Sequence, residues 1–80
     1  MTNIIYLHGF NSNPGGKFKT LKKEFPECNV IAPTFEGNPI KYFQSVDILI
    51  GNLEGETIIV GTSLGAFFGL CLSTLQDVKC

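Results

Sequence analysis

The sequence predicts an α/β fold, with a three-stranded parallel sheet and helices on both faces. Short apolar runs rich in β-forming residues alternate with segments whose apolar residues recur at helical spacing. This alternation implies parallel strands joined by right-handed crossovers. Hydrophobic residues make up 44% of the chain and charged residues only 16%, a balance rich in core and poor in surface for so short a chain. We therefore expect the chain to be the inner part of a larger domain.

The first third of the chain predicts one strand and one helix. Residues 3–7 form a continuous apolar run, which is typical of a buried parallel strand. A loop dense in turn-forming residues follows. Phe18, Leu21 and Phe25 then recur at i, i+3 and i+7 with lysines between them, which predicts an amphipathic helix over residues 15–25.

A second strand and a second helix follow. Residues 29–32 form another short apolar run that ends before Pro33. Asn38 followed by Pro39 is typical of an N-cap and the first position of a helix. Apolar residues at helical spacing extend this predicted helix to residue 50 or 53.

The last third of the chain predicts a third strand over residues 57–60 and a final helix over residues 64–75. The final helix is apolar nearly all round, and such a helix is buried on more than one side. The third strand would lie at an open edge of the sheet, which favours association with another chain.

The composition narrows the functional classes. The net charge is −1 and all six basic residues are lysines, so the chain lacks arginine, the usual bidentate reader of phosphate and guanine. We expect no nucleic-acid partner, and we interpret the lysines at 17–23 as the wet face of a helix. Three cysteines without a Cys-x-x-Cys pair indicate neither a metal site nor a disulfide framework. We expect reduced thiols in a cytoplasmic protein without a leader or a membrane span.

One motif lies between the third strand and the final helix. Residues 61–65 read Gly-Thr-Ser-Leu-Gly, the Gly-x-Ser-x-Gly pattern of a nucleophile elbow, with Ser63 at its apex. Small residues two positions to either side let the turn close, so the serine hydroxyl stands clear of the sheet. The start of a helix also points free N–H groups at the reacting centre. The alternative is an ordinary glycine-rich turn, but the apolar strand before it and the apolar helix after it favour the elbow.

A second loop is expected to lie beside this elbow. Ligands of open parallel sheets bind beyond the carboxyl ends of the strands, where the strand order switches. If the second and third strands flank the first on opposite sides, the loop after the first strand meets the start of the final helix. The backbone N–H groups of Phe10 and Leu64 would then converge on one oxygen. Such donors stabilise an oxyanion, by about 3–4 kcal/mol for a single donor in acyl transfer.

Together these two segments resemble a known family. Residues 8–12 (His-Gly-Phe-Asn-Ser) after an N-terminal strand, and residues 61–65 about fifty residues later, are similar to the α/β-hydrolase superfamily. More narrowly, they resemble the small bacterial esterases of the YqiA type. The resemblance covers essentially the whole chain and implies the N-terminal part (residues 1–80) of a single α/β-hydrolase domain. It implies Ser63 as the nucleophile, the N–H groups of Leu64 and Phe10 as oxyanion donors, and His8 and Gly9 as the loop that supports them.

The chain departs from this family after the motif. In α/β-hydrolases the acid and the histidine of the triad follow the serine in chain order. Here 17 residues follow Ser63; they contain Asp77 but no histidine. His8 is the sole histidine, at a position that the family uses structurally. A serine hydroxyl without a base is a weak nucleophile.

The other candidate groups have simpler interpretations. A P-loop is excluded because Phe18 follows Lys17 where Ser or Thr is needed. Five acidic residues are interpreted as solvated surface groups: Glu24, Glu27, Asp47, Glu54 and Glu56. Four aromatic residues are interpreted either as core or as the lining of an apolar acyl site: Tyr6, Phe10, Phe35 and Phe67.

Two hypotheses about function remain open. In the first, the chain is part of a serine esterase that hydrolyses a small carboxylic ester or thioester without a cofactor, and its acid and base come from a missing C-terminal half. In the second, it is a truncated, inactive hydrolase remnant that acts by binding. The exposed sheet edge and the apolar final helix favour self-association or a separately supplied second half.

Overall fold

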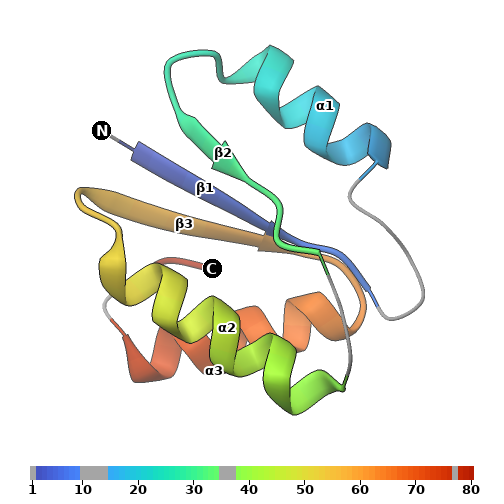
Figure 1. Ribbon diagram of the computed structural model, residues 1–80. Helices are drawn as coiled ribbons and strands as arrows, with labels where there is room; N and C mark the ends of the chain where they lie inside the picture. Colours follow the sequence, from blue (N-terminus) through green and yellow to red (C-terminus); the bar gives the residue numbers. More distant parts are fainter. Residues whose placement is uncertain (1, 10–14, 35–37, 77) are drawn as a thin grey trace.

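The sheet is parallel throughout, and its first strand lies at the centre. The computed structural model describes residues 2–9, 15–34, 38–76 and 78–80. Strands β1 (Thr2–Leu7), β2 (Asn29–Ile31) and β3 (Glu56–Gly61) form one sheet in the order β2-β1-β3 (Figure 1). β1 pairs with β3 along its whole length, from Thr2↔Glu56 to Leu7↔Gly61. The fold class and the flanking of the first strand are confirmed.

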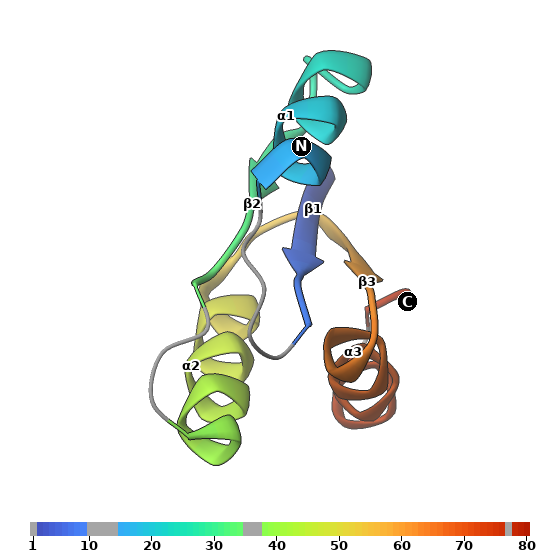
Figure 2. The ribbon, with the colours of Figure 1, turned by 90° about the vertical axis from the view of Figure 1, so that its right-hand side faces the viewer.

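Helices cover both faces of the sheet, as the sequence predicts. Helix α1 (Gly15–Glu24) lies on one face, and α2 (Pro39–Asn52) and α3 (Leu64–Leu75) lie side by side on the other (Figure 2). Both α2 and α3 run antiparallel to the strands, so their N-termini lie at the carboxyl end of the sheet (Figure 1). The arrangement is compatible with the N-terminal part of an α/β-hydrolase fold.

The hydrophobic core lies between the sheet and the α2–α3 layer. The start of α2 is fixed locally, because the Asn38 side chain accepts a hydrogen bond from the Lys41 N–H at 2.9 Å and Pro39 occupies the first turn. The buried cluster combines one face of the sheet with the inner faces of the two helices: Ile5, Leu7, Tyr42, Val46, Ile50, Ile59, Phe68 and Leu72.

The opposite face of the sheet is covered less completely. α1 contains no buried residue, although its sequence is amphipathic. Phe25, just beyond its end, is 43% exposed, and Val60 of β3 is exposed as well. The apolar stripe expected on this helix therefore exists, but the sheet buries it only in part.

The outer edge of β3 is partly paired, which corrects the expectation of an open edge. After α3 the chain returns alongside β3, and Lys79 forms a parallel bridge with Ile58. The Ile59 N–H donates to the Lys79 carbonyl at 2.7 Å, and the Lys79 N–H donates to the Thr57 carbonyl at 3.1 Å. Lys79 alone thus provides hydrogen-bond partners for the backbone groups of Thr57 and Ile59 at this edge.

Candidate active site at the carboxyl end of the sheet

Ser63 occupies a strained turn between β3 and α3. Its backbone has φ 57° and ψ −127°, and among the described residues it is the one non-glycine residue with positive φ. Residues in such sparsely populated regions cost about 1–3 kcal/mol each and persist only where the surroundings hold them. The side chain is exposed, and its hydroxyl makes no capping hydrogen bond to α3, all of whose residues the structure describes. Strand, turn and helix therefore place an accessible hydroxyl at this end of the sheet.

Two glycines allow the turn to close. A Cβ atom at Gly65 would overlap the backbone carbonyl of Leu7 in β1, and one at Gly61 would lie 2.7 Å from the backbone nitrogen of Ala66. Neither position has space for a side chain. The glycine spacing of the motif thus has a steric cause, because the first turn of α3 packs directly against the ends of β1 and β3.

In the first turn of α3, one N–H group beside the serine has no acceptor among the described residues. The N–H of Gly65 donates to the Thr62 carbonyl and that of Ala66 donates to the Ser63 carbonyl, both at 3.0 Å. The Leu64 N–H has no acceptor among the residues that the structure describes. An N–H at a helix N-terminus carries a positive partial charge, so this position suits a developing anion.

The loop after β1 packs against Ser63. A Cβ atom at Gly9 would lie 2.9 Å from the Ser63 Cβ and 3.4 Å from its Oγ, so only glycine fits there. Figure 2 shows the chain at the end of this strand running down between the ribbons of α2 and α3. The two motifs therefore meet in space. Phe10, whose N–H is the second expected oxyanion donor, lies outside the described residues, as do Phe35 and Asp77.

His8 is buried next to the serine turn and supports the loop. Its side chain is 1% exposed, and its ring centroid lies 6.0 Å from that of Tyr42. The His8 Nδ1 lies 2.9 Å from the Gly9 carbonyl oxygen. Because a carbonyl oxygen only accepts, Nδ1 carries a proton and donates it. This geometry gives His8 a positioning contact with the residue that touches Ser63.

Tyr42, a buried residue of α2, lies beside the His8 ring on the core side of the serine turn. It is 3% exposed, and its hydroxyl donates to the Pro33 carbonyl at 3.5 Å. Burial, with a smaller contribution from the charge of Tyr6, raises the pKa of Tyr42 to about 12. The phenol therefore stays neutral at any physiological pH.

A hydroxyl pair beside the serine was not singled out in the sequence. The Tyr6 hydroxyl lies 3.2 Å from the Thr62 Oγ1, directly before Ser63 in the chain. Sequence analysis assigned Tyr6 to the core or to an acyl site, and it is in fact buried. The sequence carried no signal for this contact, because it depends on the parallel register, which pairs Tyr6 with Val60 and so brings its ring near residue 62. Phe67, the other described aromatic candidate, is exposed on α3.

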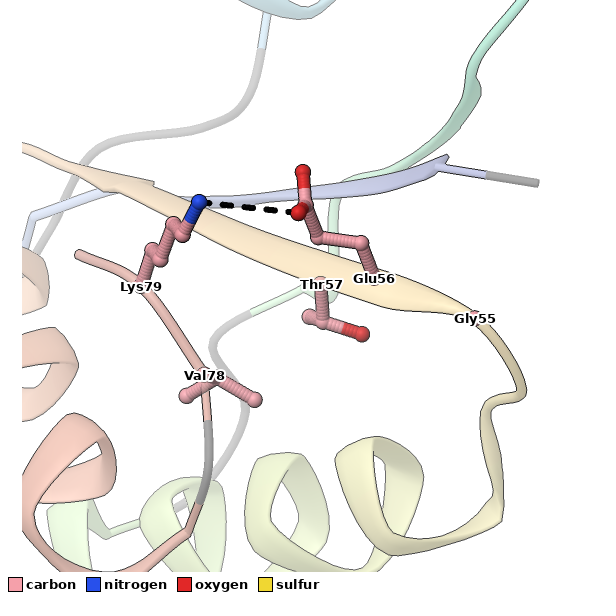
Figure 3. Close-up of a pocket in the computed structure, with 5 residues that line it drawn as sticks. All are labelled: Gly55, Glu56, Thr57, Val78 and Lys79. Atoms are coloured by element: carbon pink, nitrogen blue, oxygen red, sulfur yellow. Dashed lines mark ion pairs between the residues drawn. The ribbon is translucent and has the colours of Figure 1, made fainter.

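Two of the described carboxylates, those of Glu56 and Asp47, lie away from the serine. Glu56 begins β3, at the opposite end of the sheet, and lies 3.5 Å from Lys79 in an exposed ion pair. Figure 3 shows these two side chains pointing toward each other. They border a hollow of about 300 Å³, which is lined by Gly55, Glu56, Thr57, Val78 and Lys79. Asp47 on α2 accepts a hydrogen bond from the Gln76 side chain. Neither carboxylate reaches the serine turn, because Glu56 lies at the far end of β3 and Asp47 is tied to the end of α3.

Within the described part of the chain, no three His, Cys, Asp or Glu side chains form a group that could hold a metal ion. None of the described helices is long and apolar enough to cross a membrane.

Comparison with known proteins identifies the family. The UPF0227 protein of Citrobacter koseri is 30% identical over 83 aligned residues, which cover 95% of this chain and 46% of that relative. The UPF0227 protein YcfP of Salmonella arizonae and that of Salmonella paratyphi B match with the same identity and coverage. The chain therefore spans about half the length of these relatives. No solved structure gives a significant match. The model of the uncharacterised protein family UPF0227 matches residues 3–80, so the chain belongs to this family.

Proposed function

We propose that this chain carries the nucleophile and the oxyanion-binding elements of a serine esterase of the α/β-hydrolase type. The substrate is a small carboxylic ester or thioester. The observation that carries the proposal is the exposed Ser63 hydroxyl on a turn with positive φ, beside an N–H of α3 that has no acceptor among the described residues. Storing strain at one exposed serine is unusual unless the geometry serves a reaction.

In the proposed reaction the Ser63 oxygen attacks the carbonyl carbon of the ester. The carbonyl oxygen becomes an anion that the Leu64 N–H stabilises, and the Phe10 N–H is the second proposed donor. The proton of Ser63 passes to a base, and the alcohol or thiol leaves with a proton as the acyl-enzyme forms. Water then hydrolyses the acyl-enzyme. No cofactor enters this sequence of steps.

The proposed general base and the acid that orients it come from outside residues 1–80. His8 is unsuited to the role because its side chain is 1% exposed and its ring packs beside Tyr42 inside the fold. The greater length of the curated relatives supports a second part of the domain that supplies both groups.

A binding module without catalysis is the second candidate function. It is favoured by large apolar side chains that α3 exposes: Phe67, Leu70 and Leu75. Exposed apolar residues on one helix are typical of a surface that another polypeptide covers.

A fluorophosphonate probe separates these two candidates. Serine attack on the probe forms an oxygen–phosphorus bond and expels fluoride, and the serine proton passes to the base. The 80-residue chain is treated with the probe alone and in the presence of the part of the Citrobacter koseri relative that the match leaves uncovered. We expect a mass increase on Ser63 in the mixture and little labelling of the chain alone, because the base is absent there.

Two variants control this experiment. Ser63→Ala should abolish labelling, whereas Ser45→Ala, at an exposed serine of α2, should leave it unchanged. An unlabelled Ser63 in a mixture that forms a stable complex would overturn the esterase proposal and favour the binding module.

A further inference from the structure

The residue before the proposed nucleophile is held from three directions. The Thr62 N–H donates to the Leu7 carbonyl of β1 at 3.1 Å. Its own carbonyl accepts from the Gly65 N–H of α3 at 3.0 Å. Its hydroxyl lies 3.2 Å from the hydroxyl of Tyr6, a β1 side chain that is only 4% exposed. Contacts with two residues of β1 and one residue of α3 thus hold Thr62 in place.

The side-chain contact differs from the two backbone contacts. The backbone bonds to Leu7 and Gly65 belong to the strand–turn–helix connection and any residue at position 62 could make them. The hydroxyl contact requires both Tyr6 and a hydroxyl side chain at 62. A phenylalanine at position 6 would fill the same space in the sheet face, so packing alone does not explain the tyrosine.

A strained residue needs neighbours that do not move. Ser63 has φ 57°, a conformation that relaxes unless the residues on both sides are held in place. On its C-terminal side, the first turn of α3 and the close approach of Gly65 to Leu7 hold it. On its N-terminal side, Thr62 and its contacts hold Ser63 in place.

We infer that Tyr6 and Thr62 form a positioning pair, whose hydroxyl contact holds the Ser63 turn in its reactive conformation. Neither side chain touches the reacting atoms, so neither is a catalytic residue. This inference rests on the proposed function for its catalytic consequence, although its structural part can be measured without any activity.

The structural part is tested by nuclear magnetic resonance on the 80-residue chain. The amide-to-Hα Overhauser effect of Ser63 is stronger at positive φ than at negative φ, and relaxation dispersion detects exchange on the microsecond-to-millisecond timescale. Tyr6→Phe and Thr62→Val should both weaken this Overhauser effect and introduce exchange at Ser63. Thr62→Ser keeps the hydroxyl and should retain the wild-type signal.

A matched variant controls for the loss of a buried hydroxyl from β3. Thr57→Val removes such a hydroxyl at the amino end of the strand, where the Asn3 Nδ2 lies 3.5 Å from it. It should leave the Ser63 exchange as in the wild type. An unchanged Ser63 signal in Tyr6→Phe, or an equal disturbance in Thr62→Ser and Thr62→Val, would overturn the positioning pair.

The catalytic part is tested by labelling kinetics in the mixture with the uncovered part of the Citrobacter koseri relative. Tyr6→Phe should lower the maximal rate of fluorophosphonate labelling about fivefold, the effect of one hydrogen bond, while the probe concentration for half-maximal rate stays the same. The double variant Tyr6→Phe/Thr62→Val should be no slower than either single variant, because the two hydroxyls act as one unit.

The two parts also separate the inference from the proposed function. If the wild type is never labelled but the exchange appears as expected, the esterase proposal fails and the pair remains a holder of the turn. If the wild type is labelled and Tyr6→Phe is labelled at the same maximal rate, the inference fails and the esterase proposal stands.

Discussion

The two ends of the sheet are built in opposite ways. At the carboxyl end, the loop after β1 and the start of α3 approach so closely that Gly9, Gly61 and Gly65 leave no space for a side chain. At the amino end, a surface hollow of about 300 Å³ is lined by Gly55 and an exposed ion pair. The candidate chemistry lies at the crowded end and not at the hollow one.

Under the proposed function, crowding indicates the reactive site better than an empty volume does. The hollow near Glu56 follows from the return of the chain beside β3, and its ion pair is 74% and 52% exposed at Lys79 and Glu56. The crowded end holds a strained serine and a helix N-terminus in fixed relation. We expect substitutions at the two ends of the sheet to differ in their effect on the free energy of unfolding.

The largest expected effect is at Gly65. Gly65→Ala places a methyl group on the Leu7 carbonyl, so we expect a loss of about 3 kcal/mol or more in the free energy of unfolding. Gly51→Ala, in α2 near the amino end of the sheet, meets nothing within 4 Å and should stabilise the chain by about 0.5–1 kcal/mol. Urea denaturation measures both. Equal effects would show that the two ends are equally tolerant.

The next effect is a pH dependence at Tyr42. Its pKa is about 12 in the folded state and near 10 when unfolded, so the unfolded state loses its proton first as pH rises. The contribution of the neutral Tyr42 phenol to the free energy of unfolding is complete below pH 10. It is lost progressively between pH 10 and 12, by about 2–3 kcal/mol. Chemical denaturation across this range should show a shallower loss in Tyr42→Phe. An identical pH profile in the variant would contradict the assignment.

A smaller effect comes from the two residues with positive φ at opposite ends of β3. Ser63→Gly relieves backbone strain and should be about 1 kcal/mol more stable than Ser63→Ala. Gly55 has φ 89°, so Gly55→Ala should instead destabilise the chain by about 1 kcal/mol. Melting temperatures in matched buffers measure both changes. A Ser63→Gly variant no more stable than Ser63→Ala would mean that the turn is unstrained.

The smallest effect is expected at the amino end. Glu56→Gln removes the ion pair with Lys79, and exposed pairs contribute about 0–1 kcal/mol at most. We expect a change in unfolding free energy below about 0.5 kcal/mol that vanishes at high salt. A larger loss would make the pairing of Lys79 with β3 a major element of stability.

The sequence predicted most of the fold because its apolar periodicity was clear. The final helix was expected over residues 64–75 and occupies Leu64–Leu75, and the second helix starts at the expected Pro39. β3 extends one residue further at each end than predicted, and β2 is one residue shorter. The Gly-x-Ser-x-Gly motif also located the strained turn. The spacing of its glycines predicted a closely packed turn, and the structure leaves no space for a side chain at either position.

Two features could not be predicted because they depend on register and not on periodicity. The bridge of Lys79 to β3 involves one residue, too short to produce a pattern. The Tyr6–Thr62 contact joins residues 56 positions apart and requires both the strand pairing and the side-chain direction. The catalytic roles of Ser63, Leu64, Phe10, His8 and Gly9 remain predictions that the labelling experiments address.

The central place of β1 has a consequence for biosynthesis. This strand leaves the ribosome before either of its neighbours in the sheet, and its longer partner ends at Gly61. Until that later segment has been translated, the nascent chain carries an apolar strand with an unsatisfied edge. Non-local parallel pairing of this kind delays folding and exposes the growing polypeptide to aggregation or chaperone capture.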